Sequence, residues 1–503
     1  MDTGKTYDIG IIGGGINGCA IALDAIGRGL SVVLCEQNDF ASGTSSKSSN
    51  LIHGGIRYLE NYEFGLVRKA LKEREILLKA APHLMRPLQF ILPHEKQLRP
   101  LWLMRLGLFI YDHLYFGSSL PHAQFINLQQ QQQSGLKPAF KKAIAYYDCL
   151  TQDSRLVIEN ALKAEQLGAV MLNYHKIIDL EQHQDYWLVK VKNQFDGQIF
   201  NVKAKLLVNA SGPWFNHNLE KLNLFSNYQA DLIKGSHLVV PKLYSADNAY
   251  ILQGFDRRII FTIPYYDSYT LIGTTDVEIE KVSDAQKDLS IVSEEEKAYL
   301  CKMVNHYFNQ QIDPLKDILW QFWGIRPIFD LEPNHKNPSA KSRDYKIELI
   351  LKPNLAPLLN ILGGKITTYR ALAEQAISQV ETLFPHQGKA WTQKSVLPGA
   401  EFSSSFTHYC TEIEKQFSFL PKRMIKRILL TYGSRTSQLL RQVNSIQDLG
   451  ILFANHFSEL EIEFLIKNEW CKKMDDLLWR RSKLGLECSA KEQNEISKNF
   501  HLE

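Results

Sequence analysis

The sequence predicts an α/β fold organised around a parallel sheet, and three observations lead to this prediction. The apolar run Asp8–Ile12 leads directly into a glycine-rich turn, Gly13–Gly18, and small residues then predict a helix packed close to that strand. A second apolar run, 31–35, ends at the acidic Glu36, which completes a βαβ unit of the kind that binds dinucleotides. The pattern recurs at 358–364, where an apolar strand ends in two glycines and a helix follows.

Each glycine of the first turn has a physical role. Gly13 allows the tight turn, Gly15 lets backbone N–H groups approach a pyrophosphate, and Gly18 lets the helix pack against the strand. The N-terminus of that helix presents unpaired N–H donors and the positive end of its dipole to phosphates. Glu36 can accept hydrogen bonds from a ribose diol and would repel a 2′-phosphate, so we do not expect a ligand of the NADP type. The alternative is a βαβ unit without a ligand.

The composition indicates an ordinary globular protein of two or three domains. The chain has 503 residues, of which 45% are hydrophobic and 22% are charged. A net charge of +4 is small for this length, so we expect no nucleic-acid partner. The seven cysteines include no CxxC pair and no histidine cluster has metal-ligand spacing, so we expect buried thiols and no metal site.

The sequence also suggests a cytoplasmic location. The first predicted strand begins within ten residues of Met1, which leaves no room for a signal peptide. No apolar run reaches the ~18 residues that a membrane-spanning helix needs. We therefore expect the protein to be cytosolic or to lie on a membrane from the cytosolic side.

Between the two glycine units the pattern alternates between helices and strands. Residues 64–78 and 154–167 have apolar side chains at helical spacing, and a strand follows at Val170–Tyr174. A region rich in strands, 232–276, predicts an antiparallel sheet that could form the roof of a substrate cavity. Further strands are predicted as a hairpin-like pair at 187–191 and 199–202, and as a separate strand at Leu206–Ala210.

These elements suggest a discontinuous first domain that is interrupted by a cap and followed by a helical domain. The predicted bounds are 1–82, 145–215 and 325–388 for the first domain, 83–144 and 216–324 for the cap, and 389–503 for the C-terminal helical domain.

Eight strings of the sequence are informative when taken together: 11–18, 44–46, 51–60, 232–237, 272–276, 324–327, 342–345 and 363–370. They closely resemble strings of the FAD-dependent glycerol-3-phosphate dehydrogenases, the quinone-linked enzymes of respiratory glycerol metabolism, and they occur in that family's order. Ile56, Ser211 and Ile366 are mild departures, where the family often has leucine, threonine and leucine.

The resemblance implies a fold, a cofactor and a reaction. The fold is α/β, with a FAD-binding Rossmann-like domain of the glutathione-reductase/amino-acid-oxidase type, an inserted antiparallel-sheet substrate domain and a C-terminal helical domain. The cofactor is FAD. The reaction is oxidation of sn-glycerol 3-phosphate to dihydroxyacetone phosphate by hydride transfer to FAD, with electrons passed on to ubiquinone.

The same resemblance implies that four residues line the substrate pocket and bind the phosphate: Arg57, Tyr58, Arg343 and Lys365. A buried phosphate requires opposite charge and directed donors. On residue type alone, a salt bridge from Arg57 to a following glutamate would be the better interpretation. Arg343 stands beside an aspartate and has a similar alternative.

The catalytic residues are also expected from the resemblance. Arg326 resembles the arginine that reaches the reacting carbinol and stabilises the developing alkoxide. His53 is a candidate base for the C2 hydroxyl proton, or it only holds the flavin-proximal loop by hydrogen bonds. His237 is a further candidate base and an expected substrate contact. Lys365 opens a helix whose N-terminal donors should face the flavin pyrimidine and favour the reduced form.

The cofactor contacts come from the glycine units and from the resembling strings. The Ser/Thr cluster 44–46 could donate to the pyrophosphate, or it could be a flexible polar loop. For Leu51, simple packing is the alternative. The expected contacts are Gly13, Gly14, Gly15, Asn17, Gly18, Glu36, Thr44, Ser45, Ser46, Leu51, Gly54, Gly55, Ala210, Ser211, Gly212, Gly363, Gly364, Lys365 and Thr367.

Because ubiquinone resides in the bilayer, the resemblance implies peripheral attachment to the inner (cytoplasmic) membrane. The stretch Arg99–Phe116 combines apolar residues with bases and suits an interfacial helix, although a core helix of the cap is the alternative. A homodimer is expected from the resemblance only.

Other functions remain open on the sequence. An amino-acid or amine oxidase would use a single arginine for a carboxylate, and a glycerophosphate oxidase would use oxygen as acceptor. A flavin-binding regulatory or scaffold protein without turnover is a third alternative. An NAD-dependent enzyme is disfavoured, because the second glycine unit at Gly363 suits an extended flavin ligand.

Overall fold

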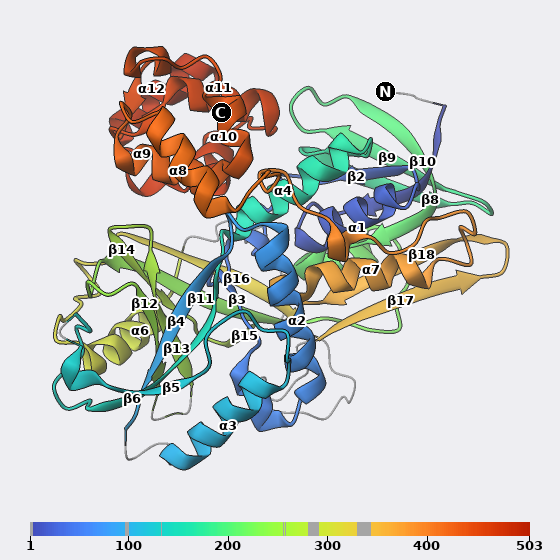
Figure 1. Cartoon of the computed structure of the whole chain (residues 1–503). Coiled ribbons are helices and arrows are strands. Elements are labelled where there is room, and N and C mark those ends of the chain that lie inside the picture. The colour runs from blue at the N-terminus through green and yellow to red at the C-terminus, as the bar shows by residue number, and fades with distance from the viewer. Residues whose placement is uncertain are drawn as a thin grey trace.

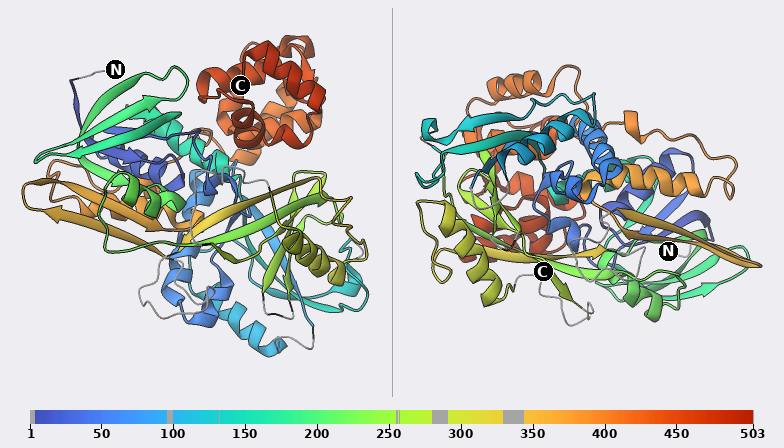
Figure 2. Two further views of the ribbon diagram at one scale, coloured as in Figure 1. Left: turned by 180° about the vertical axis from the view of Figure 1, so that it is seen from behind. Right: turned by 90° about the horizontal axis from the view of Figure 1, so that it is seen from below.

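The computed structural model contains two large sheets and a C-terminal group of helices (Figure 1). It describes residues 4–95, 100–131, 133–254, 256, 258–279, 291–328 and 344–502. The first sheet and its helices lie to the right in Figure 1, the second sheet lies to the left, and the C-terminal helices form a cluster of their own, as the reverse view in Figure 2 also shows.

The first sheet is the parallel sheet that the sequence predicts. The six strands of its main path and the helices that cover it are β1 (Thr6–Ile12), β2 (Val32–Cys35), β7 (Val170–Leu172), β10 (Ile199–Asn209), β17 (Tyr345–Lys352), β18 (Leu355–Gly363), α1 (Ile16–Gly27), α4 (Asp153–Gln166) and α7 (Tyr369–Gln379). The strand order is β17-β18-β10-β1-β2-β7, and the neighbours are parallel except for β17 and β18. Strands and helices share one buried apolar core, which fixes the positions of the strand ends.

Strand β10 corrects one detail of the predicted pattern. Residues 199–202 and 206–210 were expected in separate strands, but Ile199–Asn209 is one continuous strand. Its first half pairs antiparallel with β9 (Trp187–Asn193), which in turn pairs with β8 (His175–Gln182), and its second half pairs parallel with β1. The strand continues because its side chains alternate between buried and exposed through Lys203 and Lys205.

The second sheet contains the antiparallel strands predicted between residues 232 and 276. Its members are β3 (Leu51–Ile52), β4 (Arg86–Pro93), β5 (Gln124–Asn127), β6 (Lys142–Leu150), β11 (Asp231–Pro241), β12 (Asn248–Gln253), β13 (Ile259–Tyr265), β14 (Tyr269–Gly273), β15 (Val277–Ile279) and β16 (Trp320–Ile328). Strands β11 to β14 pair antiparallel, while β12 and β4 pair in parallel. Helix α6 (Glu294–Tyr307) packs on this sheet through a second apolar core.

The predicted domain bounds stay a prediction, and three strands of the second sheet cross them. Strand β6 pairs with β3, β4 and β5, and β16 pairs with β11, so β3, β6 and β16 all lie in the second sheet. Our bounds assign 51–52, 145–150 and 325–328, which belong to these strands, to the first domain. Two helices near this sheet are α2 (Phe64–Ala80), which matches the predicted helix 64–78, and α3 (Leu101–His113), which lies at the lower end of Figure 1.

The C-terminal helices dock on the first sheet through buried ion pairs. They are α8 (Phe406–Gln416), α9 (Lys422–Tyr432), α10 (Thr436–Leu439), α11 (Glu459–Asn468), α12 (Ala490–Phe500) and the π-helical segment η9 (Asp476–Arg481). Arg481 donates to both carboxylate oxygens of Asp39, at 2.7 and 2.9 Å, and neither side chain is exposed. Because a buried charge needs its partner, these contacts favour a single docking arrangement.

Within the described part of the chain, no helix has the length and apolarity to cross a bilayer.

Candidate active site

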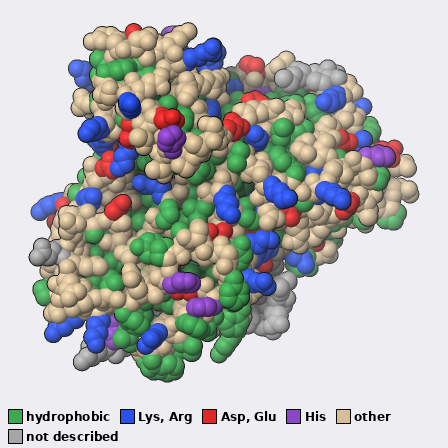
Figure 3. Space-filling model, in the orientation of Figure 1, with side chains coloured by type: hydrophobic (Ala, Val, Ile, Leu, Met, Phe, Trp, Pro, Cys, Tyr) green, Lys and Arg blue, Asp and Glu red, His purple; other side chains and the backbone are tan. Residues whose placement is uncertain are grey.

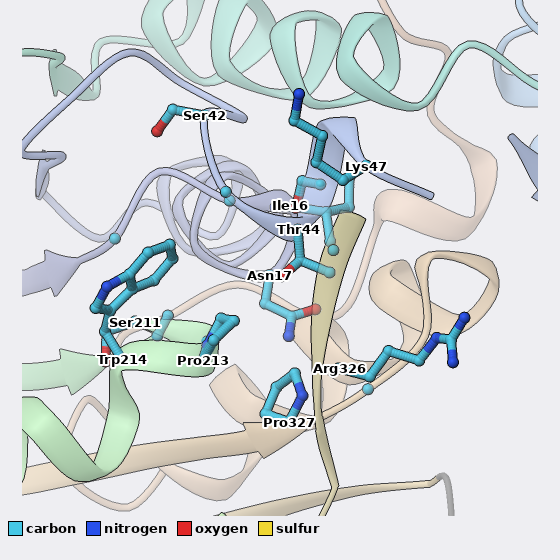
Figure 4. A pocket seen from close by; sticks show the side chains of 18 of the residues that line it. Ile16, Asn17, Ser42, Thr44, Lys47, Ser211, Pro213, Trp214, Arg326 and Pro327 are labelled. Atoms are coloured by element: carbon cyan, nitrogen blue, oxygen red, sulfur yellow. Dashed lines mark hydrogen bonds between the residues drawn. The ribbon is translucent and has the colours of Figure 1, made fainter. Parts of the chain in front are cut away.

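A cavity of about 360 Å³ lies where the carboxyl ends of β1, β2, β10 and β18 meet β11 and β16 of the second sheet. In open α/β sheets this edge is where ligands bind, because loops and helix N-termini converge there. Figure 4 shows Asn17, Thr44 and Trp214, which lie in segments that follow strands of the first sheet, together with Arg326 and Pro327 of β16 in the second sheet.

The first glycine turn is shaped by contacts that no larger residue allows. Gly13 has a φ of +106°, and a Cβ there would lie 2.6 Å from the carbonyl oxygen of Ala210. A Cβ on Gly18 would lie 1.9 Å from the Gly13 oxygen, so the helix can approach only with glycine. Gly15 lines the cavity, and a Cβ there would lie 3.2 Å from Ser45 Oγ with no other atom of the described residues within 4 Å, so a side chain would extend into the cavity.

Glu36 stabilises this turn through a hydrogen bond and also lines the cavity. Its Oε2 accepts from the Gly14 N–H at 2.7 Å, and its Oε1 accepts from the Asn38 N–H at 2.8 Å. Burial raises the pKa of the Glu36 carboxyl, although these two hydrogen bonds oppose that shift. The acid thus has a structural task in addition to the ribose contact that the sequence predicts.

The two glycine units meet at the N-terminus of α1. The Asn17 amide donates to the carbonyl oxygen of Gly363 at 3.1 Å, and the Ile16 N–H donates to Ser45 Oγ at 3.0 Å. Gly363 has a φ of +68°, which turns the chain from β18 toward α7. One ligand can therefore contact both glycine units, as the recurrence of the pattern predicts.

Beside the glycine units, the cavity is also lined by histidines and cations. Lys365 Nζ lies 3.4 Å from the centroid of the Tyr58 ring. His237 is buried, its Nε2 lies 2.9 Å from Ser49 Oγ, and its ring stacks on Phe322. Burial, together with the nearby Arg326 guanidinium, lowers the pKa of His237 to about 3, so its ring is neutral.

Arg326 extends from β16 and is ion-paired in this structure. Its Nη1 donates to Asp276 Oδ1, and its Nη2 donates to Thr274 Oγ1 at 3.0 Å. In Figure 4 the side chain points away from Trp214 and Pro213. The carboxylate and the hydroxyl fix the direction in which the guanidinium lies.

Most of the predicted site residues line this one cavity. His53, Tyr58, His237, Arg326 and Lys365 do so, and so do Gly13, Gly15, Asn17, Glu36, Thr44, Ser45, Leu51, Ala210, Ser211, Gly212, Gly363, Gly364 and Thr367. Arg343 lies outside the described residues. The predicted residues that are described but do not line the cavity are Gly14, Gly18, Ser46, Gly54, Gly55 and Arg57.

Some lining residues were missed by the sequence analysis. Lys47 lies between the serines of the polar loop, its Nζ lies 5.4 Å from the Trp320 ring, and burial lowers the pKa of its amine to about 8. A lysine inside that serine-rich string was a signal that we did not use. Trp214 and Thr274 also line the cavity, and Thr274 belongs to the resembling string 272–276.

Comparison with known proteins gives this site its class. The family model for FAD dependent oxidoreductases matches residues 8–367, and the model for the C-terminal domain of alpha-glycerophosphate oxidase matches residues 390–498. The structure is similar to that of the glycerol-3-phosphate dehydrogenase from Bacillus halodurans complexed with FAD, with a TM-score of 0.74 and 24% identity over 99% of this chain and 95% of that chain. The fold and the site therefore define a FAD-dependent oxidoreductase, and FAD is its cofactor.

Relatives with similar sequences identify the family within the class of FAD-dependent oxidoreductases. The glycerol-3-phosphate dehydrogenase of Pseudomonas aeruginosa is 44% identical over 99% of this chain and 96% of that protein. The aerobic glycerol-3-phosphate dehydrogenase of Escherichia coli is 42% identical over 98% and 97%. The chain belongs to the family of the glycerol-3-phosphate dehydrogenases. A further relative, the D-erythritol 1-phosphate dehydrogenase of Brucella abortus, is 40% identical over 97% and 96%.

The residues at the cavity fit FAD. The turn 13–18 leaves open the space that a side chain on Gly15 would begin to fill, and the α1 N-terminus offers donors for a pyrophosphate. Glu36 stands at the end of β2, where an adenosine ribose is held in dinucleotide folds. The second unit, Gly363 to Thr367, then lies where the isoalloxazine ring would be reached.

Proposed function

We propose that this protein oxidises sn-glycerol 3-phosphate to dihydroxyacetone phosphate, with FAD as the hydride acceptor and a membrane quinone as the final acceptor. The observation that carries the proposal is a single cavity that is lined both by the dinucleotide-binding glycine turns and by Lys365, Arg326, His53 and Tyr58. The names of the relatives at 40% to 44% identity support a phosphorylated polyol as substrate.

The phosphate is proposed to bind at Lys365 and Tyr58. An ammonium group held over an aromatic ring keeps its charge and its donors in a fixed place, which suits a compact dianion. Arg57 and Arg343 are proposed as further phosphate partners. Since Arg57 does not line the cavity in this structure, its part requires the side chain to turn inward on binding.

Arg326 is proposed to stabilise the negative charge that develops on the C2 oxygen of the substrate. A ring nitrogen of His53 is proposed to take the C2 hydroxyl proton. His237 is the poorer base, because a ring with a pKa of about 3 holds a proton weakly at neutral pH. When bound, FAD supplies the acceptor for the hydride that leaves C2.

Anaerobic mixing tests the first half of the proposal. The purified FAD-loaded protein is mixed with glycerol 3-phosphate, glycerol or D-erythritol 1-phosphate while the flavin absorbance is followed. We expect fast bleaching with glycerol 3-phosphate and little response to glycerol, because glycerol lacks the phosphate. Faster bleaching with D-erythritol 1-phosphate would replace the proposed substrate with the longer one.

The acceptor is tested separately. A soluble ubiquinone analogue and oxygen are offered to the protein with saturating substrate, and quinone reduction and hydrogen peroxide are measured. We expect quinone reduction to be much faster than peroxide formation. The opposite ratio would indicate a glycerophosphate oxidase, in line with the family of the C-terminal domain.

Helix α3 is the proposed contact with the membrane. It packs inward through Met104, Leu108 and Tyr111, while Trp102 and Phe109 are 67% and 59% exposed. Figure 3 shows hydrophobic side chains gathered at the lower end of the molecule, where α3 lies. An exposed apolar face with a base such as Arg105 beside it favours an anionic bilayer surface.

Vesicle sedimentation tests this contact. We expect the protein to sediment with vesicles that contain anionic lipid, and Phe109→Glu to stay in solution because a charge then faces the lipid. Phe419→Glu is the matched control, since Phe419 is 43% exposed in the C-terminal domain. Equal loss in both variants would reject α3 as the contact. A homodimer stays a prediction, which light scattering of the purified protein can decide.

A further inference from the structure

The loop between β3 and α2 is hydrogen-bonded from behind by helix α3. This substrate loop, which we define as His53 to Tyr58, carries two residues that line the cavity. Between them, the Gly54 N–H donates to the hydroxyl oxygen of Tyr111 at 2.9 Å and, at the longer distance of 3.4 Å, to Asp148 Oδ1. Tyr111 belongs to α3 and points inward, with only 2% of its surface exposed. The backbone of the loop is thus tied to a residue that lies outside the cavity lining.

The Tyr111 hydroxyl is itself fixed by a buried carboxylate. Its oxygen lies 2.9 and 2.8 Å from the two carboxylate oxygens of Asp148, to which it donates. Asp148 is fully buried on β6, and Arg74 of α2 donates to it at 2.7 Å, so its charge is compensated. Arg74 also donates to the carbonyl oxygen of Tyr147 at 3.1 Å. Asp148 therefore cannot move without breaking charge-assisted bonds.

The contact between the loop and Tyr111 is close-packed. A Cβ on Gly54 would lie 2.5 Å from the Tyr111 hydroxyl and 2.7 Å from Leu71 Cδ2. Gly55, with a φ of +76°, then turns the chain toward Tyr58. The position of the loop is set by how closely its backbone can approach Tyr111.

On its other side, the loop is held by the second glycine unit. The His53 N–H donates to Thr367 Oγ1 at 3.3 Å, and Lys365 Nζ lies over the Tyr58 ring. The loop is therefore hydrogen-bonded on one side to Thr367, an expected cofactor contact, and on the other side to Tyr111, which Asp148 holds in place. A change on either side alters the distance between His53 and the phosphate-binding end.

We propose that Tyr111 and Asp148 are positioning residues that hold the substrate loop at the distance the reaction requires. The inference rests on the proposed function, because it assigns His53 to the C2 hydroxyl and Tyr58 to the phosphate. Neither Tyr111 nor Asp148 lines the cavity. They act through the Gly54 N–H, whose direction fixes the backbone on both sides.

The test uses Tyr111→Phe in the FAD-loaded full chain. This variant removes one hydroxyl and leaves the Gly54 N–H and Asp148 without that partner. We expect unchanged FAD content, a dissociation constant for glycerol 3-phosphate about tenfold higher in anaerobic titration, and faster amide hydrogen exchange confined to residues 51–59. The general loosening of a damaged fold would instead raise exchange in many segments.

Tyr146→Phe is the matched control. The Tyr146 ring packs 5.7 Å from the Tyr111 ring in the same core, and among the described residues no bond joins its hydroxyl to Gly54 or Asp148. We expect this variant to behave as the wild type. Equal effects of the two variants on exchange at 51–59 would overturn the proposal, and so would a Tyr111→Phe variant with wild-type exchange and wild-type substrate affinity.

Asp148→Asn provides the second variant. If Tyr111 and Asp148 act in series, the double variant loses no more substrate affinity than the worse single variant, whereas additive losses contradict the proposal. The exchange measurement does not depend on the substrate. If glycerol 3-phosphate fails to bleach the wild-type flavin, the proposed function is rejected, and exchange at 51–59 still decides whether Tyr111 holds the loop.

Discussion

Arg326 and Asp276 form an ion pair at the rim of the cavity, with the guanidinium Nη1 2.5 Å from the carboxylate Oδ1. The two residues come from β16 and from the segment that follows β14, and 28% and 21% of their side chains remain exposed. The carboxylate therefore orients the cation while leaving part of it available to a ligand. This arrangement makes the role proposed for Arg326 testable.

Arg326→Ala should lower kcat by about 10²–10³, because a preorganised cation beside the developing C2 alkoxide is removed. The FAD content should stay at the wild-type level, since the glycine turns are unchanged. Asp276→Asn should lower kcat less, by about tenfold, because the arginine remains but loses its charged partner. Steady-state kinetics and the flavin-to-protein absorbance ratio measure both. Parallel losses of FAD and activity in Arg326→Ala would mean that the arginine is structural.

Lys365→Met should weaken substrate binding by about 1.5–3 kcal/mol, since a charge-assisted contact to the phosphate is lost. The flavin should still be bleached at a high concentration of glycerol 3-phosphate. Lys346→Met is the control, because Lys346 Nζ also lies over a ring, 5.1 Å from that of Tyr228, but does not line the cavity. An unchanged dissociation constant in Lys365→Met would remove this lysine from the phosphate site.

Gly15→Val should yield protein with little bound FAD, because the new side chain projects into the cavity beside Ser45. Gly65→Val is the comparison, since a Cβ on Gly65 would meet nothing within 4 Å. Flavin fluorescence after denaturation measures the FAD content of each purified protein. Full occupancy in Gly15→Val would show that the cofactor does not pass this turn.

Acid should destabilise the protein through two buried histidines. Burial lowers the pKa of both His83 and His237 to about 3, so the native state keeps them neutral while the unfolded chain protonates them below pH ~6.5. The unfolded state binds more protons between these limits, so stability rises with pH in that window and is lost as pH falls through 6.5. Each histidine should lower the free energy of unfolding by ~1.4 kcal/mol between pH 7.5 and 5.5.

His83→Phe isolates one of these histidines outside the cavity. His83 is 1% exposed, and its ring meets that of Phe406 edge to face, so an aromatic replacement keeps the packing. Urea unfolding at pH 7.5 and 5.5 should show a loss that is ~1.4 kcal/mol smaller than in the wild type. An identical loss in the two proteins would indicate that His83 is protonated in the native state.

The parts of this site that are local in sequence could be predicted from it. The turn 13–18 and Glu36 lie within one βαβ unit, and their roles follow from glycine sterics and helix-terminus electrostatics. The second unit at Gly363 follows the same rules. Its contact with the first unit, made by Asn17, was expected only in general terms, as two units on one ligand.

The rest depends on strand pairing over long distances, which residue patterns do not specify. Asp276 meets Arg326 because β11 pairs with both β14 and β16, and nothing near either residue indicates that register. The same holds for Lys47, whose amine lies near rings of β16. We assigned Arg57 to the phosphate because it lies in the resembling string 51–60, but in this structure its side chain does not line the cavity.

The most direct test of the account is the anaerobic absorbance of the FAD-loaded protein on mixing with glycerol 3-phosphate. We expect rapid loss of the oxidised flavin bands, with dihydroxyacetone phosphate formed in equal amount and only a slow response to glycerol. A flavin that is bound in full yet keeps its oxidised spectrum with glycerol 3-phosphate would contradict the account.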